Sequence, residues 1–209
     1  PKLEESHINS ILKKEKVLKY KKLGVNVNFY IDSFLSGTGK ISKDKFIDIL
    51  ARSLDSMVEK QNLEVFFFVF CPWDYEITCE ILSKMKNKGK AKIISFPRYN
   101  HLETASLVSK MDIFLGMRLH SLILSFAYNV PFVSINYATK CHDFLNLIAE
   151  EDKEITFKDL TESRLINKLE NIYKNRDSIK RMYQKKSNKF KQIVASNGLI
   201  LRRIYEKAE

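Results

Sequence analysis

Several residue types are scarce in this 209-residue sequence, and each absence excludes a class of protein. Six glycines and four prolines are too few for a collagen-like, linker-rich or loop-dominated all-β chain. The cysteines are Cys71, Cys79 and Cys141, and they form no C-x-x-C pair. An odd number of cysteines without a secretory segment favours free, mostly packed thiols in a reducing compartment.

Long hydrophobic runs are also missing. The most apolar segment, 122–133, contains Asn129 and Pro131 and is shorter than the roughly 20 residues that a membrane-spanning helix needs. The first 22 residues are too polar for a secretory signal. Because residue 1 is a proline, we expect the chain to start inside a longer product or after processing. These features predict a soluble, cytoplasmic protein, with peripheral contact at the inner face of the membrane left open.

Acidic residues are outnumbered by basic residues, and the excess lies at the two ends of the chain. The formal net charge is +11 and the isoelectric point is about 9.4. Residues 1–22 carry a net charge of +4, residues 23–160 carry −1, and residues 161–209 carry +8. No aromatic-and-basic stacking motif accompanies the basic ends, so we expect solvated helices and no nucleic-acid partner.

Hydrophobic residues make up 44% of the chain, and 14 Phe and 9 Tyr provide ample surface for a core. Strands are expected at 25–31, 65–70, 91–94, 112–116, 131–135 and 154–156, and helices at 44–60, 75–87, 101–110, 119–128, 143–149, 160–174 and 176–208. This alternation predicts an α/β fold: a Rossmann-like parallel sheet with helices on both faces. The predicted domain covers 23–158, preceded by a linker or bridging helix at 1–22 and followed by C-terminal helices at 159–209.

One segment combines charged and titratable residues at a strand–helix junction, where parallel sheets bind ligands. Arg118 and His120 follow the strand 112–116 directly. An arginine there can bind a carboxylate or phosphate with two hydrogen bonds. The positive end of a helix dipole favours a neutral imidazole until an anion binds, so His120 could become a general acid when an anionic substrate arrives. Lys140 follows the next strand and could reach the same pocket.

Two stretches carry a family resemblance. Residues 113–124 read IFLGMRLHSLIL, and residues 129–140 read NVPFVSINYATK. Their order and spacing resemble the polysaccharide pyruvyl transferase family, which shows G-x-R-L-H, then V-P, then a strand that ends in Y-x-x-K. The resemblance is specific over 62–148, is weaker at 25–60, and does not extend to the last 50 residues.

The resemblance implies a fold and an activity. Family members have a GT-B-like architecture of two Rossmann-like domains that face a cleft. They transfer a pyruvyl group from phosphoenolpyruvate to sugar hydroxyls, as a ketal, in the synthesis of capsule, exopolysaccharide or cell-wall polymers. This chain would be the C-terminal, donor-side half, with a missing N-terminal half-domain and a saccharide or lipid-linked saccharide acceptor as partners. The reaction implies no metal and no cofactor.

The resemblance also assigns roles to single residues. Arg118 and Lys140 would bind the phosphate and carboxylate of the donor, and His120 would be the catalytic acid–base residue. Leu119 would contribute backbone contacts, and Tyr137 a further contact at the donor.

Some neighbouring positions are less specific. Some relatives have an arginine where this chain reads Tyr30-Ile31-Asp32-Ser33. Residues 36–40, SGTGK, lack the phosphate-loop spacing and are interpreted as a flexible loop at the edge of the cleft. Trp73 and Asp74 follow a strand and are candidates for the cleft.

Two other functions remain open at this point. A GT-B glycosyltransferase that uses a nucleotide sugar would share the fold, but the C-terminal glutamate that grips the ribose in such enzymes has no convincing counterpart. A non-catalytic anion-binding module would use the basic C-terminal helices to contact an anionic membrane or nucleic acid. Such binding would depend on salt and would survive the loss of His120.

Overall fold

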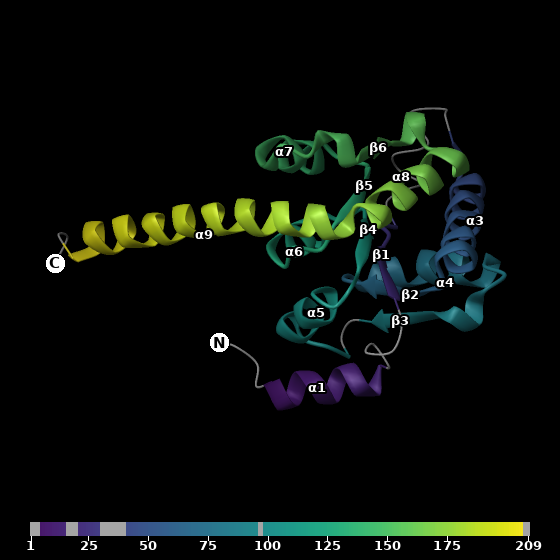
Figure 1. The fold of residues 1–209 in the computed structure, drawn as a ribbon, viewed down its shortest axis with the longest axis horizontal. Coiled ribbons are helices and arrows are strands. Elements are labelled where there is room, and N and C mark those ends of the chain that lie inside the picture. The colour runs from purple at the N-terminus through teal and green to yellow at the C-terminus, as the bar shows by residue number, and fades with distance from the viewer. Residues whose placement is uncertain (1–4, 16–20, 30–40, 96–97, 207–209) are drawn as a thin grey trace.

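The computed structural model describes residues 5–15, 21–29, 41–95 and 98–206, with the helical backbone alone for residues 197–206. Six parallel strands form one sheet in the order β3-β2-β1-β4-β5-β6 (Figure 1). The strands are β1 Lys21–Asn26, β2 Leu63–Val69, β3 Ala91–Ser95, β4 Ile113–Gly116, β5 Phe132–Asn136 and β6 Glu154–Thr156. This order is that of a doubly wound Rossmann sheet, so the predicted fold class is confirmed.

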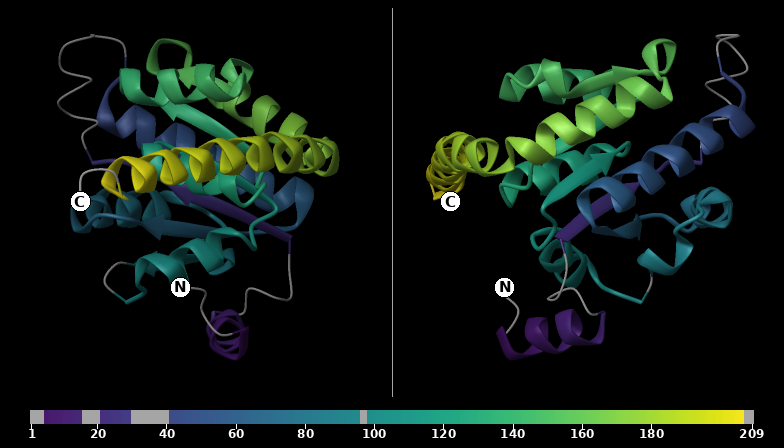
Figure 2. Two further views of the ribbon diagram at one scale, coloured as in Figure 1. Left: turned by 90° about the vertical axis from the view of Figure 1, so that its left-hand side faces the viewer. Right: turned by 45° about the vertical axis from the view of Figure 1, so that its right-hand side comes forward.

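Helices cover both faces of the sheet. They are α1 Glu5–Lys14, α3 Lys43–Gln61, α4 Tyr75–Lys84, α5 His101–Val108, α6 Leu119–Ala127, α7 Thr139–Ile148, α8 Glu162–Lys174 and α9 Arg176–Glu206. Short 3-10 turns occur at Pro72–Asp74, Lys88–Lys90, Glu151–Lys153 and Phe157–Asp159. Figures 1 and 2 show α3, α4 and α8 on one face and α5, α6, α7 and α9 on the other.

The central strands form the core, as their apolar sequences predict. All seven residues of β2 are buried, because neighbouring strands flank it and helices cover both of its faces. On β1, Gly24 lies under the ring of Phe114: a Cβ at Gly24 would lie 2.4 Å from Phe114 Cδ2. The glycine therefore makes room for an aromatic ring from β4.

Two of the predicted boundaries that differ from the structure bear on the site. The first strand was expected at 25–31, but β1 ends at Asn26, whose carbonyl accepts a hydrogen bond from the Met117 amide over 3.1 Å. Residues 30 and 31 lie outside the described residues. The helix expected at 143–149 begins at Thr139, so Lys140 lies in the first turn of α7 rather than in a loop.

The long helix α9 is anchored through its first half. The buried ring of Tyr183 packs against Phe126 and Phe132, at centroid distances of 5.3 and 5.6 Å. Lys186 Nζ donates to the buried carboxylate of Glu150 over 2.5 Å and to carbonyls at the C-terminus of α7. Beyond these contacts α9 extends past the body of the domain (Figure 1). Among the described helices, none combines the length and the apolar character that crossing a bilayer requires.

Candidate active site

The candidate site lies at the point where the direction of strand connection reverses. From β1 the chain proceeds to β2 on one side, and from β4 it proceeds to β5 on the other side. The loops that leave such a pair of strands diverge and open a crevice, where doubly wound proteins bind their ligands. Asn26 and Asn28 lie at the end of β1, Arg118 follows β4, and Asp74 follows β2.

Asp74 and Arg118 form a bidentate ion pair across this crevice. Arg118 Nε donates to Asp74 Oδ2 over 2.5 Å, and Arg118 Nη2 donates to Asp74 Oδ1 over 2.7 Å. The Asp74 side chain is completely buried, and that of Arg118 is 20% exposed. The backbone amide of Phe29 also donates to Asp74 Oδ1, over 3.2 Å. These bonds offset the cost of burying the carboxylate and fix the plane of the guanidinium.

Two buried asparagines support the arginine, and the sequence analysis missed both of them. Asn26 Oδ1 accepts a hydrogen bond from the Arg118 amide over 3.1 Å, and its Nδ2 donates to the Phe68 carbonyl over 2.9 Å. Asn28 Oδ1 accepts from Arg118 Nη2 over 3.4 Å. The available signal was the alternation of asparagine with apolar residues in Val-Asn-Val-Asn-Phe, which is unusual for a buried central strand.

The guanidinium of Arg118 keeps its positive charge. Its Nη1 remains available to a ligand. Burial alone would lower the pKa of Arg118, but the hydrogen bond and the charge of Asp74 outweigh burial and raise that pKa above its ordinary value. Within the described part of the chain, Nη1 of Arg118 makes no hydrogen bond. Asp74 therefore orients the arginine and leaves Nη1 as the donor that can reach a bound anion.

A tight turn connects β4 to α6 at this point. A Cβ at Gly116 would lie 2.5 Å from Ser121 Oγ and 2.8 Å from Leu122 Cδ2, so only glycine allows α6 to pack so closely. The Ser121 hydroxyl donates to the Arg118 carbonyl over 2.6 Å. Helix α6 begins at Leu119, and the amides of its first turn point out of the helix toward the crevice side of the sheet, where an anion is favoured.

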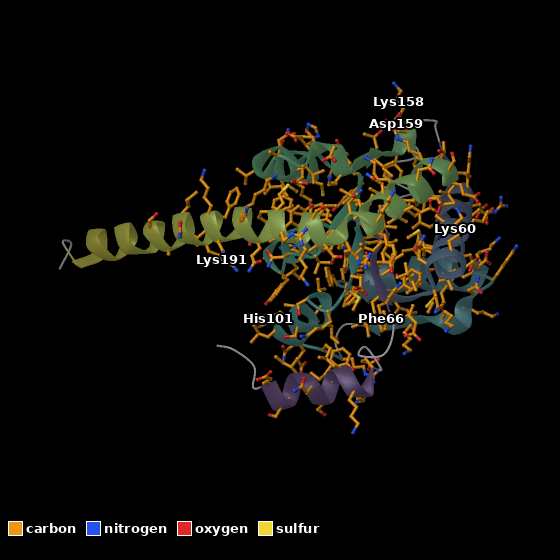
Figure 3. All side chains as sticks on the ribbon, viewed as in Figure 1. Lys60, Phe66, His101, Lys158, Asp159 and Lys191 are labelled. Carbon is orange, nitrogen blue, oxygen red and sulfur yellow. The ribbon has the colours of Figure 1, made fainter. Side chains whose placement is uncertain are left out.

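His120 is exposed and lines a groove of about 500 Å³ between α5 and α6. Phe70, Tyr128 and His101 line the same groove, and Figure 3 labels His101. No direct contact joins His120 to Arg118 among the described residues. The segment after β2 connects the two, because Phe70 lines the groove and Asp74 binds the arginine.

Tyr137 and Lys140 lie at the end of the neighbouring strand β5. The phenol of Tyr137 is close enough to Arg118 to contribute, after burial, Asp74 and Cys71, to the raised pKa of that arginine. Lys140 is exposed, and its Nζ lies 5.9 Å from the centre of the Tyr137 ring. In the part of the chain that the structure describes, Lys140 makes no direct contact with Arg118 or His120. The structure therefore arranges Arg118, Tyr137 and Lys140 along one edge of the sheet, with His120 on a separate groove.

The remaining candidates have structural surroundings or lie elsewhere. The Cys141 thiol donates to the Met117 carbonyl over 3.4 Å, and burial raises its pKa to about 11, so it is a packed neutral thiol. His142 pairs with Glu154 at 3.0 Å. Trp73 is 69% exposed, with its ring 6.1 Å from that of Phe29. Residues 30–33 and 36–40 lie outside the described residues.

The family model for polysaccharide pyruvyl transferase matches residues 11–139, which is more than half of the chain. The chain belongs to the polysaccharide pyruvyl transferase family. The matched segment includes Arg118, Leu119, His120 and Tyr137 and ends one residue before Lys140.

Solved structures show the same fold at low sequence identity. Escherichia coli ADP-heptose lipopolysaccharide heptosyltransferase II superposes with a TM-score of 0.58 at 12% identity, over 84% of this chain and 54% of that chain. WaaG, a glycosyltransferase involved in lipopolysaccharide biosynthesis, gives 0.54 at 14% identity, over 90% and 47%. These neighbours are GT-B glycosyltransferases, and this chain spans about half of their length. A search of curated proteins found no match.

Proposed function

We propose that this chain is the donor-binding half of an enzyme that transfers a pyruvyl group from phosphoenolpyruvate to a saccharide, forming a ketal in the synthesis of a surface polysaccharide or cell-wall polymer. The observation that carries the proposal is the oriented guanidinium of Arg118, which Asp74 holds at the strand switch point two residues before His120. Membership of the family supports it. The acceptor, a saccharide or lipid-linked saccharide, and a missing N-terminal half-domain complete the proposed cleft.

Phosphoenolpyruvate carries a phosphate and a carboxylate, and the site offers several donors to them. Because the Asp74–Arg118 pair is neutral as a unit, Arg118 contributes directed hydrogen bonds rather than net charge. Lys140 supplies the net positive charge, and the amides of Leu119 and His120 supply the N-terminus of α6. Tyr137, between Lys140 and Arg118, contacts the donor.

In the proposed reaction His120 is the acid. Its imidazolium donates a proton to C3 of phosphoenolpyruvate, which turns the methylene into a methyl group and leaves C2 electron-poor. One sugar hydroxyl adds to C2 and its proton returns to His120. The C2–O bond to phosphate then breaks, and a second hydroxyl adds to C2 while its proton leaves with the phosphate. The products are the ketal and inorganic phosphate, and Arg118 and Lys140 stabilise the departing phosphate.

A glycosyltransferase that uses a nucleotide sugar is the second candidate, and the similarity to GT-B glycosyltransferases favours it. Ligand-dependent thermal unfolding separates the two, because a ligand that binds only the folded state raises the melting temperature. We expect phosphoenolpyruvate to stabilise the chain and nucleotide diphosphate-sugars to leave it unchanged. Stabilisation by a nucleotide sugar alone would overturn the proposal.

Matched lysine variants test the site within the same experiment. Lys140→Ala should abolish the stabilisation by phosphoenolpyruvate, since it removes the net positive charge of the site. Lys88→Ala removes an exposed lysine from the turn before β3, at the opposite edge of the sheet, and should leave the stabilisation intact. Equal effects of the two substitutions would show that the anion binds the basic surface in general rather than this site.

A further inference from the structure

Helices α6, α7 and α9 leave an apolar groove open on the outer face of the domain. Its volume is about 450 Å³, and Ile123, Leu147 and Val194 line it with side chains that are 38%, 66% and 68% exposed. We propose that this groove and the basic surface of α9 around it form a docking surface for an anionic lipid membrane. The proposal is independent of pyruvyl transfer.

Packed aromatic rings form the floor of the groove. The Phe126 ring packs edge-on against Phe144 of α7 and Phe190 of α9, at centroid distances of 6.2 and 5.8 Å. The three helices are therefore fixed to one another beneath the exposed aliphatic side chains. Contiguous exposed apolar surface of this kind is costly in water and marks an interaction site.

Helix α9, which forms one side of the groove, is strongly basic. Residues 178–196 of α9 contain six lysines and arginines and no acidic residue, and one of the six, Lys186, pairs with Glu150. Helix α6 has no acidic residue, and α7 has one, Asp143. Lys191 itself lines the groove, and Lys185 and Lys189 are exposed on the same helix. An apolar centre with basic surroundings complements an anionic lipid surface, which takes up aliphatic side chains and attracts lysines.

Other occupants fit these observations less well. A second copy of the chain would bring an equally basic α9 against this one, and the two would repel. Nucleic acid would satisfy the lysines but would gain nothing from exposed Leu147 and Val194. An anionic membrane uses both the charge and the apolar side chains.

The groove also adjoins the groove that contains His120. Ile123 lines this groove and also the groove that contains His120. A membrane held at α6, α7 and α9 would therefore lie beside His120, where a lipid-linked saccharide could be presented. This last step alone rests on the proposed function.

Vesicle flotation of the full chain tests the proposal, with phosphatidylcholine vesicles that either contain or lack phosphatidylglycerol. We expect binding to the anionic vesicles, weakened by salt, and little binding to the neutral ones. Leu147→Glu and Val194→Glu, both at exposed positions that spare the core, should each reduce the partition coefficient at least roughly tenfold. Unchanged melting temperatures would show that these variants remain folded.

A matched charge reversal completes the test. Lys191→Glu should reduce binding to anionic vesicles roughly thirtyfold, since it changes the charge at the groove by two. Lys158→Glu makes the same change at a distant turn and should have little effect (Figure 3). Any of four results would overturn the proposal. Two concern the variants: equal effects of the two reversals, or vesicle binding that survives Leu147→Glu and Val194→Glu. The other two are tight binding to duplex DNA in place of vesicles and a stable dimer by light scattering. Loss of phosphoenolpyruvate binding would leave it standing.

Discussion

The buried carboxylate of Asp74 holds the guanidinium of Arg118 through two hydrogen bonds of 2.5 and 2.7 Å. The two residues are far apart in the sequence and meet only because β2, β1 and β4 are neighbours in the sheet. The ion pair therefore stabilises the fold and orients a candidate ligand-binding residue at the same time. Stability and donor binding should change together when it is broken.

Asp74→Asn should destabilise the chain by roughly 3 kcal/mol, because it leaves the partly buried charge of Arg118 without a counter-ion. Urea unfolding followed by circular dichroism measures the loss. The matched control is Asp159→Asn, which disrupts the exposed Asp159–Arg164 pair at 3.4 Å and should cost at most about 1 kcal/mol. Equal losses in the two variants would contradict the structural role given to Asp74.

Gly116→Ala should destabilise the chain by about 1–3 kcal/mol, because the new methyl group would overlap Ser121 and Leu122 at the start of α6. Thermal and urea unfolding provide the measurement. At Gly89 a Cβ would meet no atom within 4 Å, so Gly89→Ala is the matched control and should be neutral within about 0.5 kcal/mol. A stable Gly116→Ala variant would show that the β4–α6 turn has room that the structure does not give it.

Much of the fold follows from the sequence, because its strands carry strong local signals. The run Val65 to Phe70 is apolar throughout, which is typical of a central parallel strand, and it forms most of β2. The junction of β4 and α6 was located correctly for the same reason. The apolar run ends at Gly116, and the helical pattern begins at Leu119.

Strand β1 shows why other parts of the fold and the site could not be predicted from the sequence. Its first residues, Lys21 and Lys22, give no hydrophobic signal, yet they pair with Leu63 and Glu64 of β2, and the Lys22 amide donates to Asp112 Oδ2 over 2.7 Å. Long-range pairing thus overrides local composition. For the site, the sequence indicated Arg118 through its motif. No local pattern shows that Asp74 and Asn28 bind it, since three separate segments must meet first.

The contact between Tyr99 and Glu15 predicts that the free energy of unfolding depends on pH. The Tyr99 hydroxyl donates to the Glu15 carboxylate, and burial, together with that carboxylate, raises the pKa of Tyr99 from 10.0 to about 12. A pKa raised in the folded state means that the stabilisation is fully present below pH 10 and is lost as the pH rises toward about 12. The free energy of unfolding of Tyr99→Phe should therefore fall less steeply than that of the unchanged chain over this range. Tyr128→Phe, at an exposed position, is the control and should follow the unchanged chain.

Substitutions at the two histidines that line the same groove distinguish a catalytic acid at His120 from an effect of the shape of the groove. In the protein that carries both halves of the cleft, His120→Gln should lower kcat by roughly 10²–10⁴-fold, the range expected for loss of a general acid. It should leave the affinity for phosphoenolpyruvate nearly unchanged, because the proposed anion contacts come from Arg118, Lys140 and backbone amides. Phosphate release in the presence of acceptor and calorimetric titration with the donor measure the two effects.

His101→Gln is the matched control, since His101 is exposed and lines the groove at α5. It should keep most of the activity, and an equal loss in both variants would assign the effect to the groove rather than to an acid at His120.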